Sequence, residues 1–415
     1  MSPLAGAVRV SLTNTWLNIQ HTMTDDQHSV PGRWSVITTV QQATATSAQT
    51  TTTLARPQLI FFTELAGSAL QQLLLERQLL AELAAQQYSI ALAMTDLNDA
   101  QAEVVQQLHT HGISTVAWLL LPPDEGRWFN LQNYPQAIER YRIFRAWAQA
   151  HHLRFAAIGL DMEPPAGTTA RIQQWKPVSV IRRFWLAREN VLYPAARAAY
   201  TDLINEIHHD GYEVHTYQLP FLADDRRAGT TLIQRALDIV DLPADVEVLM
   251  CPSSLPVRLL GSDLGGALIT SYGPDADSIA IGSTGSCAGT PYSAGAGLLP
   301  LPWEALNRDI LLAARYTDVI YIFSLEGCVE QNLLPRLSDL DWSHDTQSPR
   351  HRRLLVGLFR TTLLVLLLFT RFKRALLAWL GWGLAALLFL QQIRQRWQAH
   401  SDRKANHTRS QQEDL

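Results

Sequence analysis

Cysteine is scarce in this chain of 415 residues, which contains only Cys251, Cys287 and Cys328. Three cysteines do not make the paired framework of a disulfide-stabilised protein, and no CxxC pair suggests a zinc site. All three lie near the ends of consecutive expected strands, where one pair could meet. Free cysteine is nevertheless among the residue types most often buried, so we expect three small buried thiols.

The chain also lacks a recognisable secretory signal. Its first residues, MSPLAGAVRVSLTNTW, contain no charged region followed by a long apolar run. If the protein starts at this methionine, its folded body is expected to face the cytoplasm. A start assigned to the wrong codon would change the compartment.

Charged residues make up only 17 % of the chain, and their signs are unevenly distributed. Residues 350–415 hold 12 Lys and Arg against 3 Asp and Glu, a net charge of +9. The other 349 residues hold 22 basic against 35 acidic side chains, a net charge of −13. A nucleic-acid-binding protein would carry its basic patch on the folded domain, so no nucleic-acid partner is expected. An acidic body with a basic, apolar tail favours a soluble domain whose tail contacts anionic lipid.

Residues 1–57 show no regular pattern over their whole length. The segments Val8–Ile19 and Arg33–Val40 alternate well enough to form two strands, which could pair as a hairpin. The uncharged stretch QQATATSAQTTTTLARP, residues 41–57, has the composition of a linker.

From residue 58 onward, short apolar runs alternate with amphipathic stretches eight times. Alternating strands and helices predict βαβ units and a parallel sheet, and eight units over roughly 280 residues predict an α/β fold closed into a (β/α)8 (TIM) barrel. An open doubly wound sheet is the alternative, but the first strand runs into FFTELAGS and not into a glycine-rich phosphate loop. The expected strands are Leu59–Thr63, Tyr88–Thr95, Ser114–Leu121, Phe155–Met162, Glu213–Leu219, Val246–Cys251, Ser278–Ser283 and Val319–Ser324. The expected helices are Ser68–Gln87, Ala100–His111, Tyr134–His152, Val180–His209, Thr230–Ile239 and Trp303–Tyr316.

Two apolar runs, Leu354–Thr370 and Ala375–Leu390, follow the barrel and are separated by RFKR, residues 371–374. Each run is at the short end for a membrane-spanning helix. In one arrangement they form a helical hairpin that turns at RFKR, and the positive-inside rule then places the barrel in the cytoplasm. In the other, Leu354–Thr370 lies in the membrane interface and only Ala375–Ile393 spans. Arg360 favours the second arrangement, because a central arginine is costly in lipid.

Trp379, Trp382 and Trp397 could anchor these C-terminal transmembrane helices at the interface. A buried helical hairpin of a soluble protein is the remaining alternative, but no stretch of the chain is left over to cover it. We therefore expect an N-terminal segment (1–57), a barrel (58–345), membrane-anchoring helices (350–397) that contact the bilayer through Leu354–Leu390, and a polar tail (398–415).

Acidic side chains dominate the expected carboxyl ends of the strands, where the catalytic groups of such barrels lie. No lysine is available there for a Schiff base, which argues against an aldolase. His215 is the only histidine in an expected strand, so no metal site and no cofactor are expected. Acidic, aromatic-flanked barrel mouths suit neutral sugars. The polar residues at the strand ends are Glu64, Asp96, Asp124, Glu125, Asp161, Glu163, Tyr217, Gln218 and Glu326.

The fourth expected strand, FAAIGLDMEPP (155–165), carries the sharpest signal. Side chains alternate along a strand, so Ala156, Ile158, Leu160 and Met162 form the helix-facing row. The opposite row, Ala157, Gly159, Asp161 and Glu163, then faces the barrel interior. Two carboxylates one pleat apart cannot both ionise easily, so one pKa is raised. A protonated carboxylic acid is what cleavage of a glycosidic bond requires.

The Asp-x-Glu at the end of this strand resembles that of the chitinase-like family and of the muramidase-type barrel lysozymes. The resemblance implies that Glu163 is the general acid and Asp161 its partner, which assists the acetamido group of the substrate, and that Tyr217 contacts that group. The chitinase motif has two further aspartates upstream, where this chain has Gly159 and Ala156.

Glu163-Pro164 is also similar to the Glu-Pro that ends the fourth strand of many two-glutamate retaining glycosidases. Those enzymes usually have Asn before this Glu, where this chain has Met162. Their nucleophile comes from a late strand, and Glu326 in YIFSLEGC is the candidate here, although it follows the eighth expected strand and not the seventh.

Structural roles compete with these functional ones. Asp96 in TDLNDAQ fits a helix cap, and Glu64 could serve in the same way. Trp118 and Trp175 are possible cleft residues, but Trp118 lies within a strand and fits the core better. Trp128, in the loop DEGRWFN, is the better candidate for a sugar platform, and residues 164–180 are expected to form part of the rim.

Two classes of function follow. The first is a membrane-anchored glycoside hydrolase-like protein with Glu163, Asp161 and Glu326 as catalytic candidates and with Tyr217, Gln218, Trp128, Glu64 and Asp96 as substrate-binding candidates. The second is a non-catalytic, membrane-tethered barrel that binds a glycan or a partner. The absent upstream aspartates permit this second class.

Overall fold

The computed structural model describes residues 56–65, 67–76, 79–165, 187, 190–253, 263–285 and 300–413. The two strands expected near the N-terminus, nearly all of the linker, the expected rim residues beyond Pro165 with Trp175, and Cys287 lie outside the described residues. Cys251 and Cys328 are buried free thiols, so the expectation of buried thiols is confirmed for these two.

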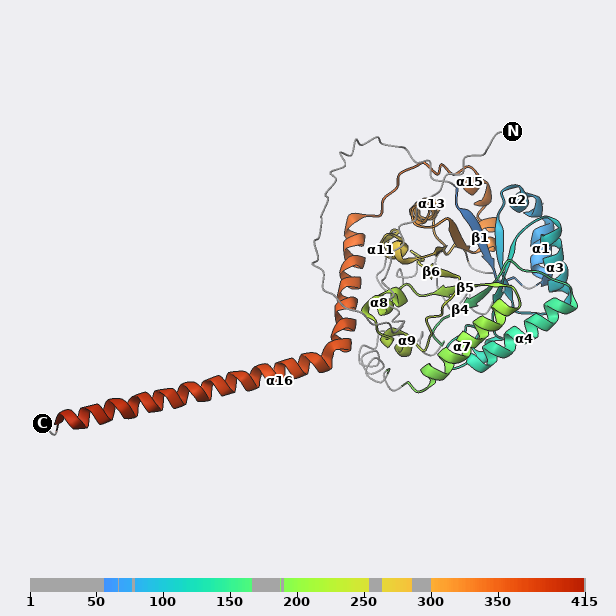
Figure 1. The fold of residues 1–415 in the computed structure, drawn as a ribbon. Helices are drawn as coiled ribbons and strands as arrows, with labels where there is room; N and C mark the ends of the chain where they lie inside the picture. Colours follow the sequence, from blue (N-terminus) through green and yellow to red (C-terminus); the bar gives the residue numbers. More distant parts are fainter. Residues whose placement is uncertain are drawn as a thin grey trace, which may run out of the picture. The chain divides into compact units, whose positions relative to one another are not determined.

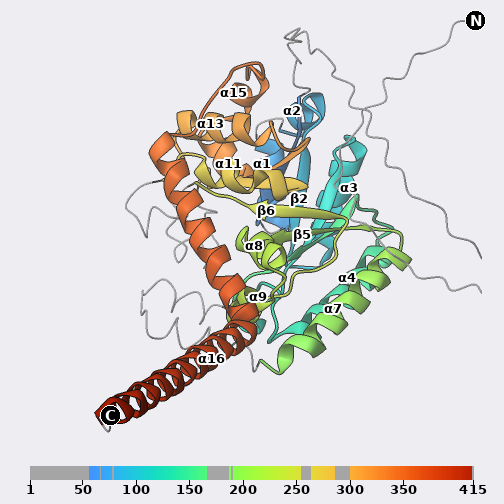
Figure 2. The same ribbon diagram turned by 60° about the vertical axis from the view of Figure 1, so that its left-hand side comes forward.

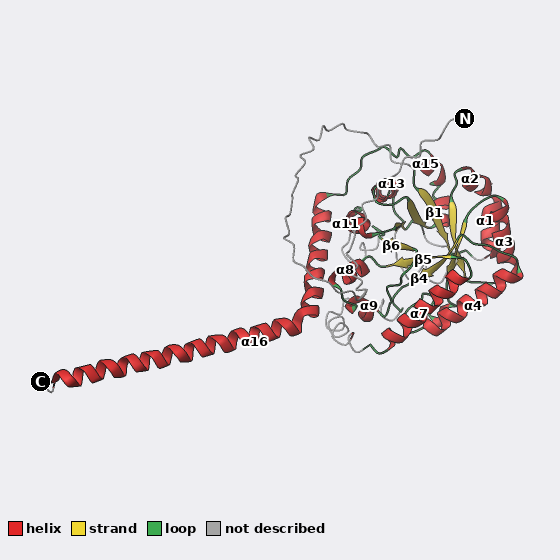
Figure 3. Cartoon of the chain, viewed as in Figure 1, coloured by secondary structure: helices red, strands yellow, loops and turns green. Residues whose placement is uncertain are grey.

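Eight parallel strands close into a barrel in sequence order, as the alternation of the sequence predicts (Figures 1 and 3). The closing pair joins β1 to β8, with Leu59 opposite Ile320. All eight expected strands are confirmed, each to within two residues at either end. Their bounds are β1 Gln58–Thr63, β2 Ser89–Met94, β3 Thr115–Leu119, β4 Ala157–Asp161, β5 Glu213–Gln218, β6 Val246–Met250, β7 Ser278–Gly282 and β8 Val319–Phe323.

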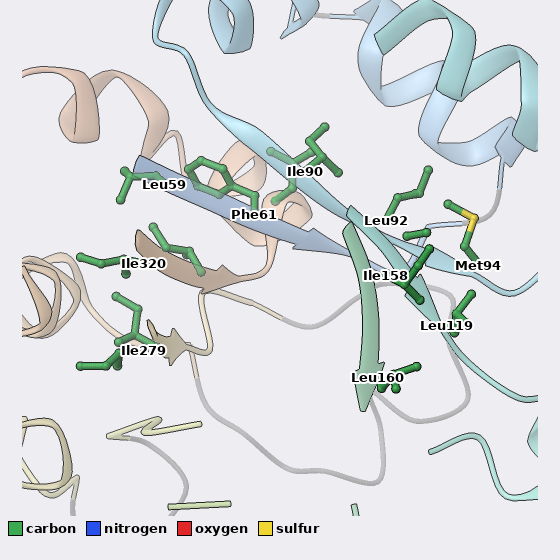
Figure 4. Close-up of a cluster of buried hydrophobic side chains, with 14 of the residues drawn as sticks. Leu59, Phe61, Ile90, Leu92, Met94, Leu119, Ile158, Leu160, Ile279 and Ile320 are labelled. Atoms are coloured by element: carbon green, nitrogen blue, oxygen red, sulfur yellow. The ribbon is translucent and has the colours of Figure 1, made fainter. Parts of the chain in front are cut away.

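The two faces of each strand belong to different cores, because successive side chains point to opposite sides of a sheet. In β4, Ile158 and Leu160 belong to the large core between the sheet and the helices, and Figure 4 shows them on the same surface as side chains of β1, β2 and β3. Ala157 belongs instead to the cluster that fills the barrel, together with Trp118 and Tyr217. The inward row predicted here runs from Ala157 to Glu163, and its first residue, Ala157, is confirmed to point into the barrel.

Most helices lie where the amphipathic stretches predict them. The described bounds are α1 Gly67–Glu76, α2 Leu79–Ala85, α3 Asp99–Thr110, α4 Tyr134–Ala150, α7 Leu192–His209, α9 Leu232–Leu237 and α13 Trp303–Ala313. The first part of the expected helix Val180–His209 lies outside the described residues. Six shorter described elements were not predicted, namely α8 Phe221–Ala228, α11 Ala267–Tyr272, α14 Leu325–Glu330, α15 Leu334–Ser338 and the 3₁₀ turns η1 Pro123–Glu125 and η3 Gly273–Asp275.

The C-terminal segment is one helix, α16 Arg350–Glu413. The expected hairpin turn at RFKR is therefore wrong, since residues 371–374 remain helical. Lysine and arginine are good helix formers, so a basic interruption between two apolar runs changes polarity without breaking the helix. Within the described part of the chain, Arg350–Phe372 is long and apolar enough to cross a membrane, and Trp379–Gln391 is a shorter apolar stretch.

The first half of α16 lies beside α11 and α8, as Figures 1 and 2 both show. Val356 and Leu367 on this side are buried, and Leu367 packs with Leu222 of α8 and Ile233 of α9. Part of the apolar character of Leu354–Thr370 therefore serves packing against the barrel. The sequence suggests no stretch that could cover a soluble helical hairpin here, yet α8 and α11 cover one face of this helix.

Candidate active site

The carboxyl ends of β1 and β4 and the loop after β3 bring four charged side chains together. Residues 127–129 extend the sheet beside the end of β4, because Phe129 N–H donates to the carbonyl of Asp161 at 2.8 Å and Glu163 N–H donates to that of Phe129 at 3.2 Å. This pairing places Arg127 and Trp128 next to the two acids of β4.

Asp161 is buried at the top of the barrel interior, with 3 % of its surface exposed. Its Oδ2 accepts a hydrogen bond from Trp118 Nε1 at 3.2 Å, whereas Oδ1 has no hydrogen-bond partner among the described residues. Burial, and then the charge of Glu163, raise the pKa of Asp161 well above its usual range, and the Trp118 hydrogen bond only partly offsets this. A buried acid with one bare oxygen is suited to holding a proton.

Glu163 lies two residues further along and is half-buried. Burial, followed by the charge of Glu64, raises its pKa to about 7, while the nearby Arg127 works in the opposite direction. A carboxyl group of this pKa is half protonated at neutral pH, as a general acid needs to be.

Glu64 and Arg127 form a buried ion pair, with 2.8 Å between Glu64 Oε2 and Arg127 Nη2. Glu64 is therefore the ion-pair partner of an arginine. Arg127 is a site residue that the sequence does not predict, because it does not lie at a strand end. It follows the end of β3 by eight residues, and only the fold of its loop brings it back to the mouth.

Glu326, in the first turn of α14, anchors the end of β1. Its Oε1 accepts hydrogen bonds from Thr63 Oγ1 at 2.6 Å, from Glu64 N–H at 2.9 Å and from Leu65 N–H at 3.2 Å. Its Oε2 has no partner among the described residues. One oxygen of the expected nucleophile thus has a structural role, and it holds in place the segment that carries Glu64.

Glu326→Ala is expected to destabilise the protein by about 2–4 kcal/mol, because it leaves the hydroxyl of Thr63 and two loop amides without their acceptor. Glu326→Gln keeps one acceptor oxygen and is expected to cost less than half as much. Thermal unfolding of the full chain measures both, with exposed Glu330→Ala as the control that changes stability by no more than about 0.5 kcal/mol. Equal stability of Glu326→Ala and the control would contradict the anchoring role.

The remaining candidates are dispersed. Tyr217 is buried inside the barrel against Phe62 and Tyr321, with ring centroids 4.8 and 5.5 Å away. Gln218 points to the helix-facing side, where its Nε2 donates to Thr216 Oγ1 at 2.9 Å. Trp128 is half-buried and packs on the cluster that fills the barrel, a position compatible with a platform at the mouth.

Asp96 is exposed and does not cap α3, so the expected capping role is wrong. The cap is Asn98, whose side-chain oxygen accepts a hydrogen bond from Gln101 N–H at 2.9 Å. Both residues are good N-caps, and the helix begins at Asp99, which puts Asn98 and not Asp96 in the capping position. Trp118, expected mainly as a core residue, is in the core and also donates to Asp161.

Tyr217 depends on Gly159, which lies directly below Asp161 in the inward row. A Cβ at position 159 would lie 2.5 Å from Tyr217 Oη and 2.8 Å from its Cε2. Phe62 and Tyr321 hold the tyrosine ring on its other sides, so the ring cannot retreat. Gly159 thus makes room for a bulky aromatic side chain.

Gly159→Ala is accordingly expected to destabilise the protein by about 1–3 kcal/mol through overpacking. Gly357→Ala is the matched control, since a Cβ there meets nothing within 4 Å and alanine favours a helix. The change in unfolding midpoint of the full chain measures both substitutions. An unchanged midpoint for Gly159→Ala would show that Tyr217 is free to move.

The raised pKa of Glu163 also makes stability depend on pH. The folded chain retains this proton up to about pH 7, whereas the unfolded chain releases it near its ordinary value of 4.5. This contribution to stability is therefore complete below pH 4.5 and is lost as the pH rises through 7, by up to about 3 kcal/mol. The pKa of His215, lowered to about 4 by burial, acts in the opposite direction, since an unfolded histidine binds a proton below pH 6.5.

Comparing the full chain with its Glu163→Gln variant isolates the contribution of Glu163, because His215 is common to both. The stability of the wild-type protein, measured by urea unfolding between pH 5 and 8, is expected to fall more steeply with pH than that of the variant. Parallel curves would contradict a raised pKa at Glu163.

Within the described ranges, no three His, Cys, Asp or Glu side chains are grouped as a metal site. The negative charge at the mouth is instead reduced in two ways. The raised pKa values of Asp161 and Glu163 favour their protonated forms, and Arg127 pairs with Glu64. The chemistry that this arrangement itself offers is proton transfer between carboxyl groups and a bound substrate.

No family model matches the sequence, and no curated protein is similar to it. Among solved structures, a GH18 chitinase from Pseudoalteromonas aurantia is 10 % identical, with a TM-score of 0.38 over 68 % of this chain and 100 % of that one. The PgaB (BpsB) glycoside hydrolase domain from Bordetella bronchiseptica is 11 % identical, with a TM-score of 0.42 over 69 % and 99 %.

An AP endonuclease of family 2 from Brucella melitensis is also similar, with 11 % identity and a TM-score of 0.35 over 66 % of this chain and 98 % of that one. The neighbours thus include glycoside hydrolases and an enzyme of a different class. At these values the likeness is one of barrel architecture, which hosts many chemistries, and any function has to be argued from the site.

Proposed function

We propose that the protein is a membrane-anchored glycoside hydrolase whose general acid is Glu163. The observation that carries this proposal is the pair of β4 acids at the barrel mouth, one buried with a bare oxygen and the other with a pKa of about 7. Two adjacent carboxyl groups with raised pKa values cost stability and are typical of sites that use them.

In this reaction Glu163 donates its proton to the glycosidic oxygen as the bond to the sugar breaks. Asp161, held by Trp118, is the partner that orients and polarises a neighbouring group of the substrate. The substrate-assisted route, in which an acetamido oxygen attacks the sugar carbon and water later opens the resulting ring, needs no second free carboxylate. It is favoured because Glu64 is paired with Arg127 and Glu326 Oε1 anchors the end of β1.

The two-glutamate route remains the alternative for the same site. It requires Glu326 to attack through its Oε2, which has no partner within the described residues. The two routes predict different responses to one substitution. Glu326→Gln abolishes turnover if Glu326 is the nucleophile and preserves it if the acetamido group is.

Anchoring is proposed from α16. Its apolar stretch Trp379–Gln391 is exposed throughout, with Trp379 and Trp382 each more than three-quarters exposed. Such a surface on a soluble protein would associate with something apolar, and the basic residues on either side favour an anionic bilayer.

A panel of chromogenic glycosides that includes N-acetylhexosaminides tests the catalytic proposal. The full chain in detergent micelles is expected to hydrolyse at least one of them. Glu163→Gln is expected to remain folded and to lose hydrolysis of the corresponding glycoside with an unactivated leaving group. No hydrolysis of any glycoside by the folded chain would reject the glycosidase proposal.

A glycan-binding barrel without catalysis is the second candidate. Its support is Tyr217, which occupies the space above Gly159 where the chitinase motif has an aspartate. The same panel separates the two candidates, since a binding protein retains the sugar without turnover, and Trp128→Ala then weakens retention.

A further inference from the structure

The first half of α16 has two faces of opposite kind. The face toward the barrel contains Val356, Arg360, Leu363 and Leu367, spaced by three or four residues as on one side of a helix. The opposite side carries seven exposed apolar residues, which we call the outer face: Leu354, Leu355, Leu358, Val365, Leu366, Phe369 and Phe372. Their exposure ranges from 48 % to 74 %, although apolar residues this large are normally buried.

Arg360 fixes this helix to the barrel. Its Nε donates to Asp224 Oδ1 of α8 at 2.7 Å, and its other nitrogens contact Asp275 and the carbonyl of Ser271. The guanidinium also lies 4.2 Å from the ring centroid of Tyr272, whose hydroxyl donates to Asp224 at 2.7 Å. Arg352 adds an ion pair with Asp263 at 2.6 Å.

These contacts argue against a membrane-spanning Arg350–Phe372. Asp224 is completely buried, and separating it from Arg360 would leave a charge without a partner. If Arg350–Phe372 crossed the bilayer, either this network would break or the polar surface of the barrel would enter the hydrocarbon. The length and composition of the segment permit a span, but the ion pairs to the barrel argue against one.

We propose that the outer face of α16 lies in the plane of an anionic membrane surface, with the barrel docked on the other side of the helix. This inference rests on the membrane association proposed above and assigns Leu354–Phe372 to the interface, so that only the later apolar run enters the bilayer. Amphipathic helices of this kind sink their apolar face about 5–10 Å into the boundary between headgroups and acyl chains.

The charges around the outer face select lipid over a second copy of the chain. RHRR (350–353) stands at the start of this face, and RFKR (371–374), which contains Phe372, stands at its end. Arg352 and Arg371 bond to the barrel, through Asp263 and the carbonyl of Ala228, so the charge available to lipid comes from the other basic residues of the two segments. Because both ends are basic, two copies paired through this face would oppose like charges in either orientation. An anionic membrane surface meets both basic ends at once.

The orientation of the barrel follows from the same contacts. Near its start, α16 contacts Asp263, just before α11, whose N-terminal Gly266 N–H donates to Ser253, three residues past the end of β6. Further along, Arg360 reaches Asp275, three residues before β7 begins. The helix therefore runs along the barrel from its mouth end toward the opposite end. With a membrane along the outer face, the barrel axis lies parallel to the membrane surface, and the mouth opens sideways.

Depth-dependent fluorescence quenching tests the proposal on the full chain. In a Cys287→Ser background, an environment-sensitive label is attached at Leu358→Cys, Val365→Cys or Phe369→Cys, and at exposed Gln106→Cys on α3 as the control. Cys251 and Cys328 are buried and do not compete. The probes are phosphatidylcholine vesicles with or without phosphatidylserine, carrying a quencher near the headgroup or deep in the acyl chain.

All three labels on the outer face are expected to shift to the blue and to be quenched more by the shallow quencher than by the deep one, to a similar extent. The effect should be greater with phosphatidylserine, and the control label should not respond. Deep quenching that exceeds shallow quenching at positions 358 and 365, which lie near the middle of Arg350–Phe372, with weaker deep quenching at 369, would show a span and overturn the proposal. Blue-shifted labels without vesicles, together with a dimer in detergent, would assign the face to a second copy.

Flotation of the unlabelled chain separates this inference from the general membrane proposal. If the chain does not float with vesicles of either composition, both the proposed membrane association and the proposed orientation are wrong. A chain that floats while its outer-face labels stay unquenched is anchored by its later apolar run alone, and only the orientation proposed here fails.

Discussion

Glu163→Gln is expected to lower kcat for a glycoside substrate by about 10²–10⁴-fold, the usual contribution of a positioned general acid. Glutamine keeps the shape of the side chain and removes the proton that the leaving oxygen needs. The loss should be largest for substrates with poor leaving groups and small for activated aryl glycosides, whose departure needs less protonation. Comparing the two kinds of glycoside therefore identifies the role as well as the residue.

The pH profile of the wild-type enzyme is the second part of this prediction. Because the pKa of Glu163 is raised to about 7, its protonated form disappears above that pH, and kcat/KM is expected to fall tenfold per pH unit from there. Asp161 lies next to it and has a raised pKa of its own. The alkaline limb of the profile therefore reports the titration of the two carboxyl groups together.

Glu64→Gln is the matched control for this profile. The charge of Glu64 helps to raise the pKa of Glu163, whereas Arg127 lowers it. The substitution removes the negative charge of Glu64 and leaves Arg127 without this partner. Both changes lower the pKa of Glu163, so the alkaline limb should shift to lower pH while the acid itself remains. A limb that stays in place, or moves to higher pH, would contradict this electrostatic account.

The barrel could be predicted from the sequence because its signals are local. Each strand is a short apolar run, each longer helix shows its own amphipathic period, and the order of the units implies a parallel sheet. The elements that escaped prediction are short. α8 and α11 contain eight and six residues, too few for a helical period to stand out from their loops.

The acids of β4 could be predicted for the same reason, since alternation along one strand decides which side chains point inward. Their surroundings could not. Arg127 reaches Glu64 across 63 positions in sequence, and Glu326 reaches Thr63 across 263. Such pairs depend on the folded loops, and a residue type alone does not reveal them.

Arg360 is the clearest case of a residue whose type was noticed and whose partners were not. In the sequence it is a charge inside an apolar run, which suggested a cost in lipid. Its partners, Asp224 and Asp275, lie 136 and 85 residues earlier in the chain. In the structure Arg360 pairs with the barrel. Because these ion pairs would be lost or buried in lipid if the helix spanned the bilayer, they favour a membrane that lies along the outer face.

Arg360→Met is therefore expected to destabilise the protein by about 3–5 kcal/mol, the usual cost of leaving one member of a buried ion pair alone. Asp224 is completely buried and, among the residues that the structure describes, would retain only the hydroxyl of Tyr272 as a donor. Asp275 would be less affected, because Arg227 also contacts it, with Nη2 2.7 Å from its Oδ1. Urea unfolding of the full chain in detergent micelles measures the loss.

Two further variants show whether the cost comes from the buried charge. Asp224→Asn combined with Arg360→Met removes both charges and should recover most of the lost stability, since a neutral pair no longer leaves an ion in the core. Arg227→Met removes a half-exposed partner of Asp275 and should cost no more than about 1 kcal/mol. If Arg360→Met were as mild as Arg227→Met, α16 would not be held by this network, and a helix free to leave the barrel could span the membrane after all.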